Sequence, residues 1–132
     1  MKDIGSGVTR PLQKGSKLLC ADNTGAKELE VIAVIGYKGK RKANPNAGVG
    51  SVVVCTVTKG NEKVRHEKFN CVVIRQRKEY RRHDGMWVRF EDNAAIIIDD
   101  QDAPKGSFIK GPVAREAVQR FSTISKIASI VA

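Results

Sequence analysis

The sequence has few aromatic residues, three cysteines and no long hydrophobic run. No apolar stretch approaches the ~18 residues of a membrane-spanning helix, and residues 1–15 lack the apolar segment of a secretory signal. Cys20, Cys55 and Cys71 are odd in number, widely spaced and set in apolar surroundings, without a CxxC pair. These features argue against a disulfide-rich secreted domain and a structural zinc site. We expect a cytoplasmic protein whose cysteines are free and buried.

Residues suited to catalysis are scarce as well. The chain has two histidines, His66 and His83, and its carboxylates are mostly scattered singly, whereas catalysis needs titratable groups that converge. Turn formation explains the run His83-Asp84-Gly85 better than a catalytic His/Asp pair does. The acidic run at 99–102 lacks EF-hand spacing, so a solvated strand end is the simpler interpretation. We expect no enzyme activity, no metal and no cofactor.

Positive charge is abundant. The chain has 24 Lys and Arg against 14 Asp and Glu, a formal net charge of +10, which favours a polyanionic partner, with nucleic acid as the first candidate. No segment reads as a basic amphipathic helix, so a membrane surface is disfavoured. Two stretches, 38–42 and 75–82, concentrate the charge. Their basic residues are Lys38, Lys40, Arg41, Lys42, Arg75, Arg77, Lys78, Arg81 and Arg82.

The pattern from residue 16 to 99 is typical of β-strands. Apolar or β-branched runs at 17–21, 28–36, 51–58, 71–78 and 93–99 are separated by breaks rich in Gly, Asn, Asp or Lys. No persuasive helical period and no βαβ spacing appear before Gly111, which favours antiparallel pairing. We predict a small antiparallel barrel of five strands over about 16–100, because closure removes unpaired edges.

The C-terminal residues are predicted to cover this barrel. The runs at 52–55 and 94–98 are apolar without strict alternation, so both faces of those strands should be covered. Gly111-Pro112 is typical of a helix opening, and Ser122 can cap a second helix. Two short α-helices within about 112–131 should dock on the barrel or on a partner, because neither would persist alone. We expect one domain over 1–132.

A projecting hairpin is predicted at 78–91. Asp84-Gly85 favours a two-residue type I′ turn, which places Arg82 opposite Trp87 and puts Tyr80 on the same face. This cationic, aromatic face suits RNA, since guanidinium and indole planes can stack on an unpaired base. An ordinary cross-strand cation–π pair between Arg82 and Trp87 is an equally simple interpretation. Both alternatives stay open.

Four segments resemble a known family. Residues 20–36, 46–60, 71–98 and 111–116 are similar, in the same order, to the universal family of ribosomal protein fourteen of the large subunit, and look closest to its archaeal branch. The third segment is the most specific, with aliphatics, a basic spacer, Asp-Gly, an aromatic residue and Asn before further aliphatics. Cys71 and Ile96 depart mildly from the family pattern. The resemblance covers nearly the whole chain.

The resemblance implies a structural constituent of the large ribosomal subunit that binds large-subunit rRNA. It also implies a place at the intersubunit interface, contact with small-subunit rRNA, and a neighbouring ribosomal protein on the ribbon. The rRNA-binding residues would be the nine basic residues named above, together with Trp87. A factor that blocks subunit joining would use the C-terminal helical face, where Arg115 and Lys126 are the candidates. The alternative there is an i, i+4 pair of Glu116 with Arg120 on a solvated helix.

Two other functions stay open. A free-standing, OB-like protein that binds single-stranded nucleic acid would need several exposed aromatic residues on the barrel, whereas aromatics make up 5% of the chain. A small nuclease or metal-dependent enzyme would need carboxylates or histidines that converge.

Overall fold

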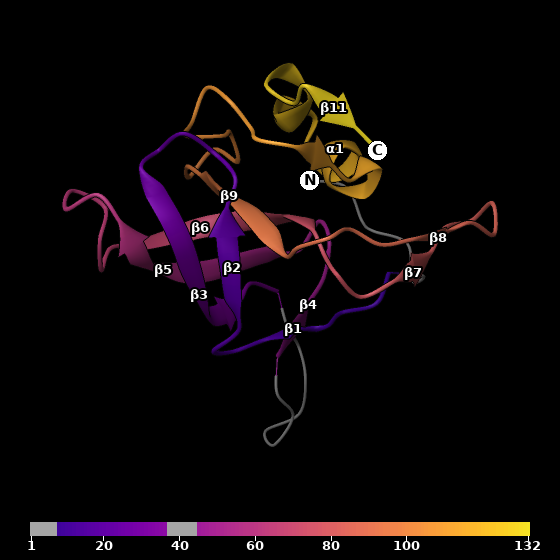
Figure 1. Ribbon diagram of the computed structural model, residues 1–132, viewed down its shortest axis with the longest axis horizontal. Coiled ribbons are helices and arrows are strands. Elements are labelled where there is room, and N and C mark those ends of the chain that lie inside the picture. The colour runs from indigo at the N-terminus through magenta and orange to yellow at the C-terminus, as the bar shows by residue number, and fades with distance from the viewer. Residues whose placement is uncertain (1–7, 37–44) are drawn as a thin grey trace.

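Five strands form a closed barrel in the computed structural model, which describes residues 8–36 and 45–132 (Figure 1). They are β2 (Lys17–Cys20), β3 (Ala26–Val34), β5 (Val52–Gly60), β6 (Lys68–Arg75) and β9 (Ala94–Ile98), hydrogen-bonded in that order. The predicted five-stranded barrel is confirmed. The predicted fourth strand, 71–78, is displaced toward the N-terminus, since β6 begins at Lys68 and ends at Arg75, after which the chain leaves the barrel.

The ring is closed by its first and last strands. The successive pairings from β2 through β3 and β5 to β6 are antiparallel, and β6 also pairs antiparallel with β9. The pair β2–β9 is parallel, with Leu19 opposite Ala94 and Cys20 opposite Ala95. Just beyond β2, Asp22 Oδ2 accepts a hydrogen bond of 3.0 Å from the backbone N–H of Ile97. A buried carboxylate thus reinforces the closure.

Alternating residues of the strands fill the barrel interior. Cys71 and Val73 of β6 belong to the interior cluster, which also includes Leu29, Val31, Val53, Cys55, Val57, Ala95 and Ile97. Cys20, Cys55 and Cys71 are free, as predicted; Cys55 and Cys71 are buried and Cys20 is partly buried. A hydrogen bond with Cys55, together with burial, holds the pKa of the Cys71 thiol well above its ordinary value. These thiols serve as small apolar side chains.

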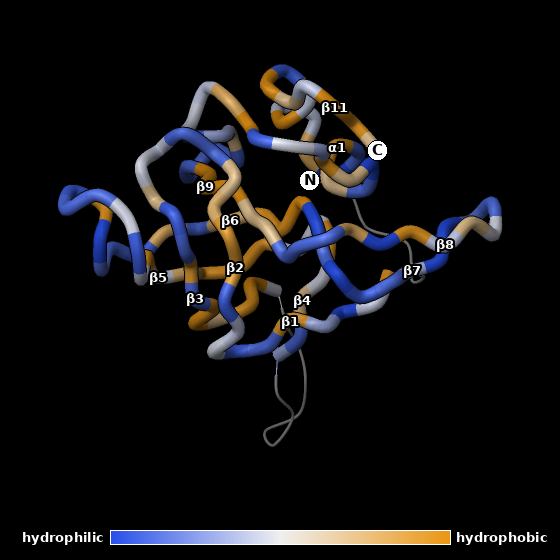
Figure 2. The backbone as a smooth tube through the Cα atoms, in the orientation of Figure 1, coloured by the Kyte–Doolittle hydropathy of each residue, from blue (hydrophilic) through white to orange (hydrophobic). Residues whose placement is uncertain are grey.

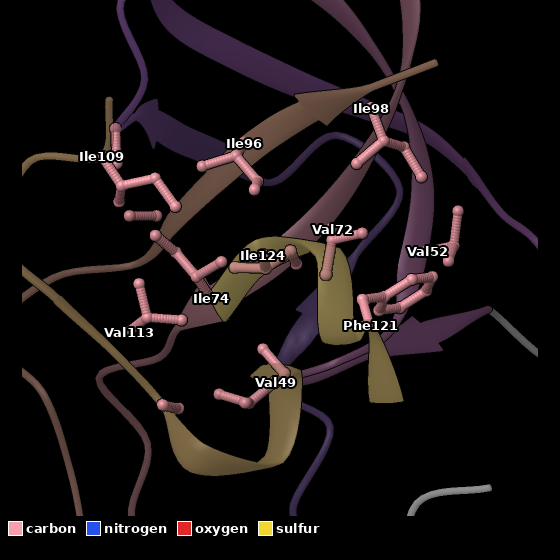
Figure 3. Packing of buried hydrophobic residues seen from close by; sticks show 14 of the residues in the cluster. Val49, Val52, Val72, Ile74, Ile96, Ile98, Ile109, Val113, Phe121 and Ile124 are labelled. Carbon is pink, nitrogen blue, oxygen red and sulfur yellow. The ribbon is translucent and has the colours of Figure 1, made fainter. Parts of the chain in front are cut away.

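The outward-facing residues of the same strands form a second core. Val72 and Ile74 of β6 and Ile96 of β9 pack against Phe121 and Ile124 from the C-terminal segment, and Figure 3 shows these side chains converging from both layers. Each side chain of this size contributes about 1.5–3 kcal/mol when fully buried. The prediction that the C-terminal residues cover the barrel is therefore confirmed.

The prediction of two α-helices from Pro112 onward is wrong in detail. Pro112–Val113 forms strand β10, which pairs in parallel with β11 (Ile130–Val131), and the Ala114 N–H donates to the Ile74 carbonyl at 3.0 Å. These tertiary hydrogen bonds hold the segment extended where a helix start was predicted. The single α-helix of the described residues, α1, spans Arg115–Arg120, and a five-residue 3-10 helix, η1, spans Ser122–Lys126.

Residue 121 separates these two short helices. Phe121 has φ −126° and ψ 88°, which ends α1, and it occupies the N-cap position of η1, so Ser122 is the first residue of that helix and not its predicted cap. Phe121 is nearly fully buried, so packing of its ring decides the local backbone.

No helix in the described part of the chain is long and apolar enough to cross a membrane.

The hairpin at 78–91, here called the arm, projects from the barrel as its own two-stranded sheet (Figure 1). Its strands are β7 (Tyr80–Arg81) and β8 (Trp87–Val88). A further short pair, β1 (Leu12–Gln13) with β4 (Asn46–Ala47), lies beside the barrel.

The predicted type I′ register of the arm is wrong by one residue. The loop has three residues, because the Arg82 N–H donates to the Met86 carbonyl and the Gly85 N–H to the Arg82 carbonyl, each at 2.9 Å. Gly85 has φ +86°, the left-handed conformation that such a loop needs at its third position. Arg81, rather than Arg82, is therefore opposite Trp87. A shift of one residue exchanges the two faces of a strand.

Candidate nucleic-acid interface

The outer face of the arm carries exposed cations beside an exposed indole. Arg81 lies directly opposite Trp87 in the β7–β8 pair. Arg89 lies two residues beyond Trp87 along the same side of the hairpin, and strand alternation puts it on the same face. All three are exposed, with 63% of Trp87 accessible. Within residues 8–36 and 45–132, neither arginine forms an ion pair. This face can therefore meet a phosphate and a base together.

The inner face of the arm is attached to helix α1. The Tyr80 hydroxyl donates to Glu116 Oε2 at 2.7 Å, and Arg82 Nε donates to Glu116 Oε1 at 2.8 Å. Arg82 also donates to the backbone oxygen of Ala132 at 2.8 Å, and its guanidinium lies 5.9 Å from the Tyr80 ring centre. Tyr80 is fully buried. The cation–π contact thus involves Tyr80, on the face opposite to Trp87.

This network sets the ionisation of its members. Burial, followed by the hydrogen bond to Glu116, raises the pKa of Tyr80 well above its ordinary value, so the phenol stays a donor. Burial opposes ionisation of Glu116, but the hydrogen bonds from Arg82 and Tyr80 outweigh it and hold the pKa of that carboxyl below 4.5. The carboxylate is therefore a permanent acceptor at neutral pH.

Arg75 is likewise occupied inside the protein. Its side chain is 9% exposed. Nε and Nη2 donate to the two carboxylate oxygens of Asp92 at 2.8 and 3.2 Å, and Nη1 donates to the carbonyls of Lys110 and Pro112 at 2.7 and 3.0 Å. Both Arg75 and Arg82, which the sequence placed among the rRNA contacts, use their guanidinium groups to hold the structure together. Both side chains are largely buried, which makes them poor candidates for an RNA contact.

A groove of about 530 Å³ lies at the base of the arm and is called the base groove below. It is lined by Pro11, Leu12, Ser16, Lys17, Arg77, Lys78, Glu79 and Asn93. The Arg77 N–H donates to Asn93 Oδ1 at 2.8 Å, which anchors the chain where it leaves β6. Lys78 pairs with Glu79 at 3.0 Å, whereas the exposed Arg77 side chain forms no ion pair in the described part of the chain.

Lys17 is a site residue that sequence reasoning missed. It lies at the start of β2, far from the arm in the sequence, and the β2–β9 pairing helps to bring it beside Arg77 and Lys78. Its ammonium lies 3.5 Å from Glu28, with 66% of the side chain exposed. An isolated lysine at a strand start carries no signal of such a role. The base groove therefore places Lys17, which was not predicted, beside Arg77 and Lys78, which were.

The remaining predicted residues fall in two places. Lys38, Lys40, Arg41 and Lys42 lie outside the described residues, so their predicted contacts stay predictions. Arg115 and Lys126 are both exposed, at the start of α1 and the end of η1. Across residues 8–36 and 45–132, no group of three or more His, Cys, Asp or Glu side chains is placed to hold a metal ion.

Comparison with known proteins gives a consistent result. The family model described as ribosomal protein L14p/L23e matches residues 11–132. A protein named large ribosomal subunit protein uL14 from Methanococcus vannielii is 51% identical over 131 residues, covering 99% of each chain. Proteins of the same name from Haloarcula marismortui and Halorubrum lacusprofundi are 48% and 51% identical over the same length, again with 99% coverage of each.

Proposed function

This chain belongs to the ribosomal protein L14p/L23e family, and from that premise we propose that its arm and base groove bind large-subunit rRNA. Membership gives the chain a structural, non-enzymatic role in the large ribosomal subunit, in the cytoplasm. Its relatives at about half identity are archaeal, which agrees with the archaeal-like sequence pattern.

One observation carries the proposal. Arg81 and Trp87 face each other across the arm and are both exposed, while the neighbouring Arg82 is turned inward to Glu116. The strand alternation thus separates an RNA-facing cation from a structural one within two consecutive residues. A guanidinium can pair bidentately with phosphate, and an indole can stack on an unpaired base.

The base groove extends this surface. Lys17, Arg77 and Lys78 line one concave site next to the arm, where a phosphate backbone could run from the groove onto the outer face. The arm is held to α1 by the Glu116 contacts, so little conformational entropy is lost when it binds. We propose Lys17, Arg77, Lys78, Arg81, Trp87 and Arg89 as the rRNA-binding set among the described residues.

We also propose partners on other surfaces. The protein would lie at the face toward the small subunit and contact small-subunit rRNA across the interface, and a neighbouring ribosomal protein would dock on the arm, as the family resemblance implies. The C-terminal face, with exposed Arg115 and Lys126 near the exposed Ile130 (57%) and Val131 (47%), would bind a factor that blocks subunit joining. A mixture of apolar and basic side chains suits a protein partner better than bare RNA.

The alternative of a free-standing OB-like protein is not favoured. In the described part of the chain, the large aromatic side chains with high exposure are Trp87 and Phe108. Neither lies on a barrel strand, so the barrel face offers no row of stacking platforms.

Cosedimentation with large subunits tests the proposal. We expect Arg81→Glu/Arg89→Glu to leave the particle fraction at a salt concentration that retains the native chain. The matched control, Lys105→Glu/Lys110→Glu, reverses two exposed charges away from the arm and should behave like the native chain. If the interface neutralises six to ten phosphates, affinity should fall by roughly 10³ to 10⁵ between 50 and 200 mM salt. Equal retention of both double variants would refute the proposal.

A further inference from the structure

A second polar groove lies at the other end of the molecule. The connection between β5 and β6 projects from the barrel on the side away from the arm, at the opposite end of the long axis (Figure 1). Together with the start of β3 it encloses a groove of about 530 Å³, called the β5–β6 groove below. Its lining includes Lys27, Thr58, Lys59, Asn61, Arg65 and His66. The lining contains neither a carboxylate nor an apolar side chain, unlike pockets for small apolar ligands.

Two glycines shape the floor of this groove. Ala26 is opposite Gly60 in the β3–β5 pair, and a Cβ on Gly60 would lie 2.8 Å from the Gly25 carbonyl oxygen. A Cβ on Gly25, which has φ +97°, would lie 2.7 Å from Asn61 Nδ2. The absence of both side chains lets the two backbones touch and lets Asn61 lie over Gly25.

The turn that forms the far wall is well ordered by hydrogen bonds. The Arg65 N–H donates to the Asn61 carbonyl and the His66 N–H to the Val57 carbonyl, each at 2.9 Å. Arg65 Nη2 reaches back to the Gly60 carbonyl at 3.2 Å. His66 is held at φ +65°, a conformation that is uncommon for residues other than glycine. The side chains are thus presented from a defined backbone.

The charge in this groove is incompletely balanced. Lys59 lies 3.5 Å from Glu28, but Glu28 is shared with Lys17 at the same distance. Lys27 forms no ion pair within residues 8–36 and 45–132, and Arg65 retains N–H groups beyond the one that bonds Gly60. Figure 2 shows that most of this connection is hydrophilic. Of the three cations in the groove, Lys59 alone is paired in the described part of the chain, and it shares its carboxylate with Lys17.

We infer that the β5–β6 groove binds the phosphate backbone of a second rRNA segment, at the end of the molecule opposite to the arm. Lys27, Lys59 and Arg65 supply the charge, and the Asn61 amide can donate to a phosphate oxygen. Because the described lining contains no Phe, Tyr or Trp and is dominated by cationic and amide groups, this site is suited to the backbone more than to the bases. The inference rests on the proposed function in that it presumes an RNA-binding arm at the other end.

A two-duplex assay tests this inference. One short RNA duplex is immobilised, the full-length chain is bound to it, and capture of a second, fluorescent duplex is measured. Three double variants are compared: Lys27→Gln/Arg65→Gln in the groove, Arg81→Gln/Arg89→Gln in the arm, and Lys105→Gln/Lys110→Gln as the control. We expect the native chain and the control to capture the second duplex, and the groove variant to bind the first but not the second.

Salt dependence makes the test quantitative. The slope of log affinity against log salt should become shallower by about 0.9 for each phosphate that the protein no longer neutralises, hence by about 1.8 in the groove variant. Retention of capture by Lys27→Arg/Arg65→Lys would agree with a role of charge alone. If the groove pair alters folding, as judged by its urea midpoint, Lys27→Gln alone should give about half the slope change.

The outcomes separate the two proposals. If the groove variant matches the control in slope and capture while the arm variant loses binding, the inference is overturned and the proposed function stands. If the arm variant matches the control while the groove variant loses binding, the proposed function fails and the groove remains an RNA site. If both match the control, both are overturned, and an acidic protein becomes the better partner for the groove.

Discussion

Arg82 Nε donates to Glu116 Oε1 at 2.8 Å, and this contact joins the arm to helix α1. Each side chain is 14% exposed, so the pair is largely removed from water. The arm would otherwise be a two-stranded ribbon without a core of its own, which is marginal in water. Its rigidity therefore depends on a residue more than thirty positions further along the chain.

Substitutions of the neighbouring Arg81 and Arg82 should differ in their effects on stability and on RNA binding. Arg82→Gln should lower the free energy of unfolding by about 1.5–3 kcal/mol, because it removes hydrogen bonds to a partly buried carboxylate. Arg81→Gln, on the exposed outer face, should change stability by less than about 0.5 kcal/mol but weaken RNA binding. Urea unfolding and RNA titration of both variants check this. Equal stability of the two would contradict the assignment of faces.

The Glu116 network should make stability depend on pH. Its pKa in the folded protein lies below 4.5, so its contribution to stability is present above about pH 4.5 and is lost as the pH falls through the folded-state pKa. The stability difference between the native chain and Glu116→Gln should be full at neutral pH and shrink in acid. Urea midpoints measured across this range check it, with the exposed Glu67→Gln as control. A difference that stays constant down to strongly acidic pH would rule this out.

Arg75→Lys tests geometry at constant charge. A lysine ammonium cannot reproduce the four hydrogen bonds that the guanidinium makes to Asp92, Lys110 and Pro112. We expect a loss of about 3 kcal/mol in the free energy of unfolding, since hydrogen bonds involving charged groups contribute about 1.5–3 kcal/mol each and some are retained. Arg77→Lys, at an exposed site, is the matched control and should be nearly neutral. A neutral Arg75→Lys would show that Arg75 is free for RNA.

Trp87→Ala should separate base stacking from folding. The indole is 63% exposed, so its removal should change stability by less than about 0.5 kcal/mol. If it stacks on an unpaired base, affinity should fall by about 1–3 kcal/mol. Binding to an RNA with a single-stranded loop, compared with a fully paired duplex, measures the effect. Trp87→Phe should recover part of the loss, and an unchanged affinity for the looped RNA would exclude stacking.

The barrel was predictable because its signals are local and repeated. Apolar runs such as 52–55 and 94–98 indicate strands covered on both faces, and that pattern correctly required an outer layer. The free, buried cysteines followed from their apolar neighbours. The C-terminal segment was harder, because Pro112 satisfies the local rules for a helix start while its actual conformation depends on pairing with Ile130.

The functional surface was predictable only in part. Charge clustering located the arm, but Asp84-Gly85 is compatible with a two-residue and a three-residue loop, and the choice decides which arginine faces outward. Arg75 and Arg82 read as free cations because their acceptors, Asp92 and Glu116, are distant in sequence. Lys17 reads as an ordinary strand-end lysine for the same reason. The composition gives the amount of positive charge, whereas the fold determines which cations are paired internally and which are exposed to a partner.

The parallel pair β2–β9 has a consequence for biogenesis. The strands that close the ring come from near the beginning and beyond the middle of the chain, so a nascent chain that has not yet emerged past Ile98 holds an open sheet with β2 and β6 as bare edges. Such edges invite pairing with other chains. Once β9 has paired with both β2 and β6, these edges are no longer available to other chains. The C-terminal segment then covers the outer apolar face of the strands.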